Sequence, residues 1–419
     1  MGTERAQRFA APFLASDPGD FGACFATTGA LDDGTRILNV DDTETAGLSE
    51  DLDEVAAHEG IAHLRVLARA PRAAGSAEET AARDYCSKVL RDAGFDVAIE
   101  PFEYSALPGR FGTPIAGAMG AVSVLTAAWL ATVQRAPRAA ALVLGLALAA
   151  LALFAWRMLG NGVLDLPWVR AQGENLVARR GAMTPRVWLV AHLDTKSQPV
   201  PSGTRMLGIA LLALALVLTI VTLAMTLATG SSRTTLWLLC VGLGVTGGGV
   251  VVASVVRNDS PGAVDNASGV AAVLSAAVRL DASAAVGVLL PSAEELGLAG
   301  ARAWIRAHGA ERAFVLNCDG VDDQGELTIM YTRSVPEPLV HAVRSAAAGG
   351  VRVRRMPPGL LLDSVAFADA GWSAATVSYG SVKTLSRVHT PSDSFEHLQG
   401  RSIGPVATVL ARAAEALAR

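Results

Sequence analysis

The chain is poor in aromatic and charged residues, which make up only 5% and 18% of its 419 residues, although half of the residues are apolar. Ala, Leu, Val and Gly carry the excess hydrophobicity, a bias typical of lipid-facing helices. Lysine occurs only at positions 88, 196 and 383, whereas arginine is abundant, as in proteins of GC-rich bacteria. Since the net charge is -4 and no basic stripe exists to neutralise phosphates, we expect no nucleic-acid partner.

Cysteine is scarce as well. Cys24, Cys86, Cys240 and Cys318 form no C-x-x-C pair and show no framework spacing, so all four are predicted to be reduced. The first residues show no long apolar core followed by a small-residue cleavage site, so no secretory signal is expected. The chain exceeds the usual size of one domain, which leaves room for a catalytic core and a second part.

Long uncharged apolar runs supply that second part. Four of them stand as two close pairs, over 111–134, 139–156, 206–232 and 234–256. Each approaches or exceeds the roughly 20 residues that a helix needs to span a bilayer, so we predict two transmembrane hairpins with four transmembrane helices. Buried core helices of a soluble protein are the alternative, which the arginines at the ends of the runs disfavour. In the last run a Gly-xxx-Gly pair, Gly244 and Gly248, would let a neighbouring helix approach closely.

Around the hairpins the sequence alternates between strand and helix patterns. Ser76 and Glu79 form a capping box for a helix that runs to Gly94, and residues 95–104 alternate like a strand. Further strands are predicted over 175–180, 186–194, 286–292, 313–319, 326–332 and 374–380. This order predicts an α/β fold with a mostly parallel mixed sheet sandwiched by helices and interrupted twice by the hairpins.

The predicted organisation begins with an acidic arm over residues 1–54. From residue 17 the arm carries many acidic residues against a single arginine, Arg36, which predicts a flexible segment: a solvated tail, or a docking or autoinhibitory segment. The peptidase-like parts and the hairpins then alternate along the chain, over 55–110, 111–158 (first hairpin), 159–204, 205–257 (second hairpin) and 258–419.

Five short segments place metal-competent side chains at strand ends or helix starts: AHLDTK, GAVDNASG, PSAEELGLAG, LNCDG and VHTPSDS. A lone His or Asp at such a place is more often structural, but together the segments supply two histidines and three carboxylates. A pair of zinc ions needs imidazole and carboxylate ligands, one carboxylate able to bridge, and an open position for water. The carboxyl ends of parallel strands converge on one edge of a sheet, so these segments are expected to meet there.

In this order and with these neighbours, the segments resemble the dinuclear-zinc aminopeptidase family of clan MH. That family includes bacterial leucyl aminopeptidases, aminopeptidase Y and glutamate carboxypeptidase. The resemblance covers residues 55–108 and 173–419 and is strongest at AHLDT, SAEELGLAGARAW and HTPSD. It implies two Zn²⁺ ions per chain, although the ligand types alone also admit other divalent metals. It further implies a peptide substrate and a cis peptide bond after the bridging aspartate.

The family's ligand positions carry over onto matching residues of this chain. By this resemblance Asp265 bridges both ions. His192 and Asp319 complete one site, and Glu295 and His389 complete the other. The resemblance thus implies a complete set of five metal ligands.

Other residues are expected to act beside these ligands. The resemblance makes Glu294 the general base for the bridging water, a role that suits a carboxylate next to a ligand. Asp194, two residues after His192, faces the same side of its strand and is expected to orient the imidazole. Asn266 and Asp393 are weaker candidates for such support, and Asp393 is equally placed to cap a helix.

The chain departs from the family in two places. More than 70 residues, including the second hairpin, separate His192 from Asp265, where the family has a short connection. Relatives often have histidine at the position of Ser364, so Asp363 and Ser364 receive no role. Only about a dozen residues separate His192 from the third apolar run, so at about 3.5 Å per residue the metal site is expected within roughly 40 Å of the bilayer. We therefore expect the mouth of the site to face the membrane, with hairpins that serve only as anchors as the alternative.

These observations predict a membrane-bound metallopeptidase, by default an aminopeptidase. Its substrates are expected to be peptides, including membrane-associated ones or ones delivered by a transporter. The basic residues at the catalytic ends of the runs predict a cytoplasmic catalytic domain in a bacterial inner membrane. A non-catalytic receptor or scaffold and a one-zinc, glutaminyl cyclase-like enzyme are the alternatives. Transport is not expected, because the runs contain almost no charged residues, and the oligomeric state is left open.

Overall fold

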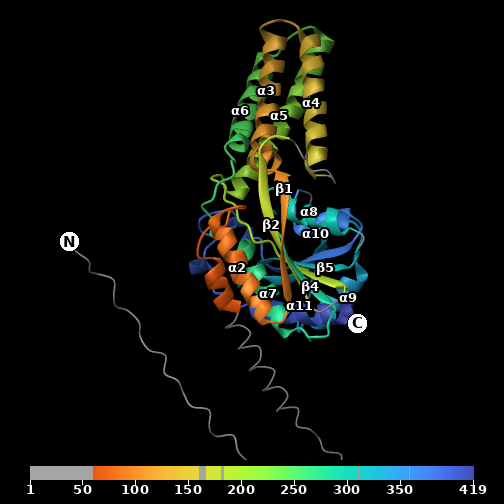
Figure 1. Ribbon diagram of the computed structural model, residues 1–419. Helices are drawn as coiled ribbons and strands as arrows, with labels where there is room; N and C mark the ends of the chain where they lie inside the picture. Colours follow the sequence, from red (N-terminus) through yellow and green to blue (C-terminus); the bar gives the residue numbers. More distant parts are fainter. Residues whose placement is uncertain (1–59, 160–166, 181–183, 310, 358) are drawn as a thin grey trace, which may run out of the picture. The chain divides into compact units, whose positions relative to one another are not determined.

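The computed structural model describes residues 60–159, 167–180, 184–309, 311–357 and 359–419 (Figure 1). The predicted acidic arm and Cys24 lie outside these residues, and the other three cysteines are free and buried. Residues 60–67 are helical and precede α2 (Ala77–Asp92). The predicted capping box is present with one difference. Ser76 accepts a hydrogen bond from Glu79 N at 3.1 Å, whereas the Glu79 carboxylate accepts from Gly75 N at 2.7 Å.

An eight-stranded sheet is the centre of the fold, in the order β1-β2-β4-β3-β5-β8-β6-β7. Its strands are β1 (Asp96–Ser105), β2 (Arg170–Arg179), β3 (Val187–Val190), β4 (Val286–Leu290), β5 (Phe314–Val321), β6 (Glu326–Tyr331), β7 (Arg352–Arg355) and β8 (Ser373–Gly380). Strand β3 lies parallel to β4 and β5, β5 lies parallel to β8, and β6 lies parallel to β7. The pairs β1/β2, β2/β4 and β6/β8 are antiparallel, so the predicted mixed α/β sheet is confirmed.

Helices cover both faces of this sheet. Helices α2, α7 (Gly269–Arg279), α9 (Glu337–Ala346) and α11 (Ile403–Ala418) share the larger core with one face. Helices α8 (Ala299–His308) and α10 (Asp363–Asp369) pack on the other face around Trp188 and Trp304. Short helical turns are η1 (Ala263–Ser268), η2 (Thr384–Ser386) and η3 (Phe395–His397). Because both faces are covered, the central strands are continuous apolar runs rather than alternating ones.

The four apolar runs form α3 (Leu107–Thr132), α4 (Pro137–Leu159), α5 (Ser202–Thr229) and α6 (Thr234–Val252). Each helix is long and apolar enough to cross a membrane, by length and composition, and the four lie side by side (Figure 1). Buried threonines bond within their own helix, as where Thr219 donates to Ala215 O at 2.7 Å. Large apolar side chains point outward, for example Leu142 at 66% and Leu238 at 67% exposure, so the bundle presents an unusually apolar surface.

Glycines allow α6 to lie against its neighbours, as the spacing of Gly244 and Gly248 predicts. A Cβ at Gly248 would lie 2.6 Å from Ala121 Cβ of α3, and one at Gly244 would lie 3.0 Å from Val124 Cγ1. On the other side of α6, a Cβ at Gly247 would lie 2.6 Å from Leu212 N of α5. Any larger residue at these positions would have to push the helices apart.

The substitution Gly248→Leu is expected to destabilise the bundle by about 1–3 kcal/mol, because the added side chain overpacks the contact between α3 and α6. Gly249→Leu is the matched control, since nothing lies within 4 Å of a Cβ at that position. Thermal unfolding in detergent, followed by tryptophan fluorescence, should show a lower midpoint for the Gly248 variant only. Equal midpoints for the two variants would contradict this packing.

Candidate active site

The predicted ligands meet at the carboxyl ends of the central strands. His192 follows β3, Glu294 and Glu295 follow β4, Asp319 lies near the end of β5, and His389 lies beyond β8. Past the last residue of β3 the chain stays extended, because Ala191 N and Leu193 N donate to carbonyl groups of the β4 segment at 3.3 and 2.9 Å. The sheet itself therefore fixes where His192 lies.

Asp265, in η1, lies between the two histidines. Its Oδ1 is 3.2 Å from His192 Nε2 and its Oδ2 is 3.0 Å from His389 Nε2. The peptide bond between Asp265 and Asn266 is cis, as the resemblance implies. A carboxylate with one oxygen facing each imidazole has the arrangement that a bridging ligand needs.

Two groups of three donors form around this carboxylate. They are His192, Glu294 and Asp319, and Asp265, Glu295 and His389, and the donor atoms of each group lie within 4.8 Å of one another. The first group contains the expected base, Glu294, whose Oε2 is 3.9 Å from His192 Nε2, while Asp319 Oδ2 is 3.6 Å from the same nitrogen. The structure thus brings the five expected ligands and the expected base into one cluster.

The donor set fits a pair of divalent cations. Asp319 Oδ2 is buried and accepts no hydrogen bond from the described residues. Burial raises the pKa of Asp319 to about 8 and that of Glu294 well above its usual range, with neighbouring carboxylates adding to both shifts. Burial alone would lower the pKa of His192, but Glu294 and the other acids around it raise it well above its usual range. Bound cations would neutralise these crowded carboxylates.

Asp194 supports the cluster differently from the expected way. Its carboxylate accepts the N–H groups of Glu294 and Glu295, at 2.9 and 3.2 Å. His192 Nδ1 lies 3.0 Å from the backbone oxygen of Asp194 and 3.7 Å from its carboxylate Oδ1. The backbone of Asp194 is therefore the nearer partner of the imidazole, and its carboxylate holds the turn that carries the acid pair.

Asp393 and Asn266 hold the segment around Asp265. The Asp393 carboxylate accepts the N–H groups of Val264 and Asp265, at 2.7 and 3.1 Å, so it caps η1 from a distant part of the chain. The Asn266 amide donates to Cys318 O at 3.0 Å and accepts from Gly320 N at 3.2 Å. These bonds set the distance between Asp265 and Asp319.

The backbone enters the left-handed region at two non-glycine residues of the site, Ala293 (φ 57°) and His389 (φ 65°). Such conformations are unfavourable for residues with a Cβ and persist where the surroundings enforce them. Ala293 directly precedes Glu294, and His389 is itself an expected ligand. The strain therefore lies at the residues that aim the side chains of the cluster.

Two residues of the site received no role from the sequence. Lys196 Nζ lies 2.5 Å from Glu295 Oε2. The sequence could have pointed to Lys196 only through the rarity of lysine, which occurs at three positions in the chain. Asp363, at the start of α10, is fully buried, and neither of its carboxylate oxygens is hydrogen-bonded to a residue that the structure describes. Burial raises its pKa to about 7, with a further contribution from Asp194 and opposition from His192, so it lies within electrostatic reach of the cluster.

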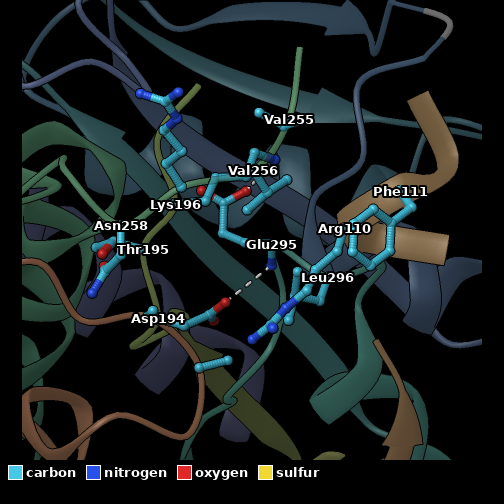
Figure 2. Close-up of a pocket in the computed structure, with 13 residues that line it drawn as sticks. Arg110, Phe111, Asp194, Thr195, Lys196, Val255, Val256, Asn258, Glu295 and Leu296 are labelled. Atoms are coloured by element: carbon cyan, nitrogen blue, oxygen red, sulfur yellow. Dashed lines mark hydrogen bonds and ion pairs between the residues drawn. The ribbon is translucent and has the colours of Figure 1, made fainter. Parts of the chain in front are cut away.

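A pocket of about 280 Å³ opens beside Glu295. Thr195 and Lys196 lie on one side of it, and Arg110 and Phe111 of α3 lie on the other (Figure 2). The segment 255–258, which follows α6, also lines it. The start of the first hairpin and the segment that follows the second therefore both contribute walls.

Comparison with known families gives one match. Residues 245–414 match the model of peptidase family M28. The matched segment contains Asp265, Glu294, Glu295, Asp319 and His389, whereas His192 precedes it. No curated protein matches the chain.

Solved structures agree in fold. LapA aminopeptidase of Legionella pneumophila is 12% identical, with 92% of this chain and 78% of that chain covered and a TM-score of 0.51. An aminopeptidase from Aneurinibacillus sp. strain AM-1 is 14% identical, with 85% and 92% covered and a TM-score of 0.49. A glutaminyl cyclase of Fimbriiglobus ruber is 13% identical, with 86% and 95% covered and a TM-score of 0.49. The similarity to LapA aminopeptidase shows the fold, and no argument is drawn from the two structures with a TM-score of 0.49.

The metal-free protein is expected to lose stability as the pH rises from about 4 to 8. The pKa values of Glu79 and Asp363 are about 7 and that of Asp319 is about 8, all raised by burial above the usual range near 4. Between the unfolded and folded pKa values the folded state holds more protons, so deprotonation disfavours folding. Zinc should raise the unfolding midpoint more at pH 8 than at pH 6, since it binds the deprotonated ligands. Thermal unfolding with chelator or zinc at several pH values tests this, and a metal-free midpoint that rises with pH would contradict it.

Proposed function

Since the chain is a metallopeptidase whose residues 245–414 match peptidase family M28, we propose that it is a membrane-bound, two-metal exopeptidase and, by default, an aminopeptidase. The observation that carries this proposal is the Asp265 carboxylate set between His192 and His389, with Glu294 beside it. A single-zinc enzyme would not need both donor groups, which favours the peptidase over a cyclase.

Two divalent ions would be held by two sets of donors, with the Asp265 carboxylate available to both. His192 and Asp319 would hold one ion, and Glu295 and His389 would hold the other. When bound, two zinc ions lower the pKa of a bound water toward about 7 and polarise the peptide carbonyl. The chain's own residues must then place the substrate and move the proton.

Glu294 is the residue that moves the proton. It is buried, lies within 4 Å of His192 Nε2, and has a pKa raised by burial well above its usual range. A carboxyl group tuned in this direction accepts the proton of the attacking water and returns it to the leaving amine near neutral pH. Asp194 fixes this group in place through the backbone N–H groups of Glu294 and Glu295.

Glu294→Gln is expected to lower hydrolysis by about 10²–10⁴-fold while about two zinc ions per chain remain bound, because it removes the base and leaves the ligands. Glu337→Gln, at an exposed carboxyl of α9, is the matched control. The measurement uses detergent-purified full-length protein, metal analysis, and peptides that are N-terminally free, N-blocked or C-blocked. Release of N-terminal residues from free peptides only would support an aminopeptidase.

Other outcomes of the same panel would contradict the proposal. Ring closure of an N-terminal glutamine without release of a residue would indicate a cyclase. Two bound metal ions without turnover of any peptide would indicate a non-catalytic receptor or scaffold. Full activity of Glu294→Gln would show that Glu294 is not the general base.

The proposed setting is a bacterial inner membrane, with the two hairpins, over 111–158 and 205–257, inserted in the peptidase chain. Four helices of spanning length and their apolar outward faces support this setting. At the peptidase end of the first hairpin, Trp156 and Trp168 are 65% and 63% exposed, and Arg157 and Arg170 adjoin them in the sequence. Exposed tryptophans mark a membrane interface on either side, whereas basic residues favour the cytoplasmic side, so we place the catalytic part in the cytoplasm.

A tag placed after Arg419 is expected to resist protease in intact spheroplasts and to be digested after lysis, because the catalytic part lies inside. A periplasmic marker protein that is digested in both samples serves as the control. Digestion of the tag from outside would reverse the orientation. Full recovery of the protein in the soluble fraction without detergent would contradict membrane insertion.

A further inference from the structure

The pocket beside Glu295 is built jointly by the peptidase part and the helical bundle. Gly109 of α3 lies directly against the chain that follows Glu295, since a Cβ at this position would be 2.4 Å from Leu296 Cα. This approach brings the next two residues, Arg110 and Phe111, into the pocket wall (Figure 2). The start of α3 is thus held within the pocket by a backbone contact that only glycine permits.

The opposite wall is fixed as firmly. Arg257, which follows α6, exchanges two backbone hydrogen bonds with Ser197, each 2.8 Å long. Ser197 directly follows Lys196, whose ammonium group contacts Glu295. Two separate connections therefore place Arg110 and Arg257, which adjoin the bundle, in the walls of a pocket that is also lined by Glu295, an expected metal ligand.

The acidic groups of this pocket already have partners. Both oxygens of Asp194 accept backbone N–H groups, and Glu295 lies against Lys196 at 2.5 Å and His389 at 3.0 Å. The side chains of Arg110 and Arg257, in contrast, are exposed and make no hydrogen bond or ion pair within the described chain. The free charge of the pocket is positive, so it suits an anion and repels a cationic amino terminus.

We propose that this pocket receives the leaving-group side of the substrate and that Arg110 binds its terminal carboxylate. The assignment rests on the proposed exopeptidase function and names its substrates as di- and tripeptides with a free C-terminus. The scissile bond lies at the metal cluster beside Glu295, and each further residue adds at most about 3.5 Å. One or two residues therefore fill a pocket of about 280 Å³. Phe111, Val256 and Leu296 supply apolar contacts for the side chain of the leaving residue.

Arginine suits this task because its planar guanidinium donates two parallel hydrogen bonds to a carboxylate. The same chemistry would accept the phosphate of an anionic lipid headgroup, since the pocket adjoins the bundle. The peptide carboxylate is favoured because Glu295, an expected metal ligand, lines the same pocket and because the pocket is small. The two sources are separated by the experiment below.

The test compares Leu-Leu with Leu-Leu-amide, using full-length protein loaded with zinc in phosphatidylcholine nanodiscs. The wild type is expected to favour the free acid by about tenfold or more in kcat/KM, mainly through KM, because a charge-assisted contact is lost with the amide. Arg110→Ala should bring this acid-to-amide ratio close to one. Arg110→Lys should give an intermediate ratio, since lysine keeps the positive charge but lacks the two parallel donors of the guanidinium group. Arg138→Ala, at an exposed arginine of α4 that does not line the pocket, is the matched control and should leave the ratio unchanged.

A wild-type ratio near one, or an equal loss for both substrates in Arg110→Ala, would overturn the assignment while leaving the exopeptidase function intact. If neither peptide is cleaved, the proposed function fails. Calorimetric binding of N-acetyl-leucine, compared with that of N-acetyl-leucinamide, then tests separately whether the pocket binds a carboxylate. Arg110-dependent preference for the acid would support the assignment, and equal binding would overturn it. If phosphatidylglycerol in the nanodiscs competes with Leu-Leu in the wild type but not in Arg110→Ala, the occupant is a lipid phosphate and the peptide assignment is wrong.

Discussion

The site depends on the carboxylate of Asp265, which is held between the imidazoles of His192 and His389. One of these residues precedes Asp265 in the sequence and the other follows it. Burying so many carboxylates together is unfavourable unless each side chain is held in place and its charge is neutralised. Asp393 fixes Asp265 by accepting its backbone N–H group, and Asn266 ties the same turn to the end of β5. Arg72, far earlier in the chain, holds the same segment by donating to Pro261 O at 2.7 Å and to Gly262 O at 3.2 Å. None of these contacts involves the hairpin over 205–257, which is the physical reason that a long insertion between His192 and Asp265 is compatible with the cluster.

Both hairpins use the same arrangement, because each leaves the peptidase part and returns to it at neighbouring points. Ala106 N, just before α3, donates to Val169 O at 2.9 Å, and Ser197 and Arg257 pair on either side of the second hairpin. When the ends of an insertion are already adjacent, extra length in it costs little entropy and does not disturb the sheet. As a consequence, the start of the first hairpin and the segment that follows the second lie in the walls of the pocket beside Glu295.

The sequence predicted what depends on local pattern or on spacing. Run length alone gave the four apolar helices, and the short segments around His192, Glu294 and His389 gave the residues that meet in the cluster. Strand β7 was not predicted, because three of its four residues are arginine and only Val353 marks an apolar face on this exposed strand. The roles of Lys196 and Arg110 escaped for a different reason. Lys196 contacts Glu295, and Arg110 lines the pocket because its neighbour Gly109 lies against Leu296. Both contacts join residues that are far apart in the sequence, and no periodicity encodes such a contact.

The contact between Gly109 and Leu296 joins the helical bundle to the α/β part of the molecule. Leu296 follows Glu295, and the N–H group of Glu295 donates to Asp194, so the turn that carries the acid pair has α3 on one side and the His192 segment on the other. A protein interior so closely packed transmits a shift rather than absorbing it. A change in the position of α3 would therefore move Arg110 relative to Glu295, and with it the length of the substrate that the pocket accepts. The bundle thus contributes directly to the walls of the pocket beside Glu295.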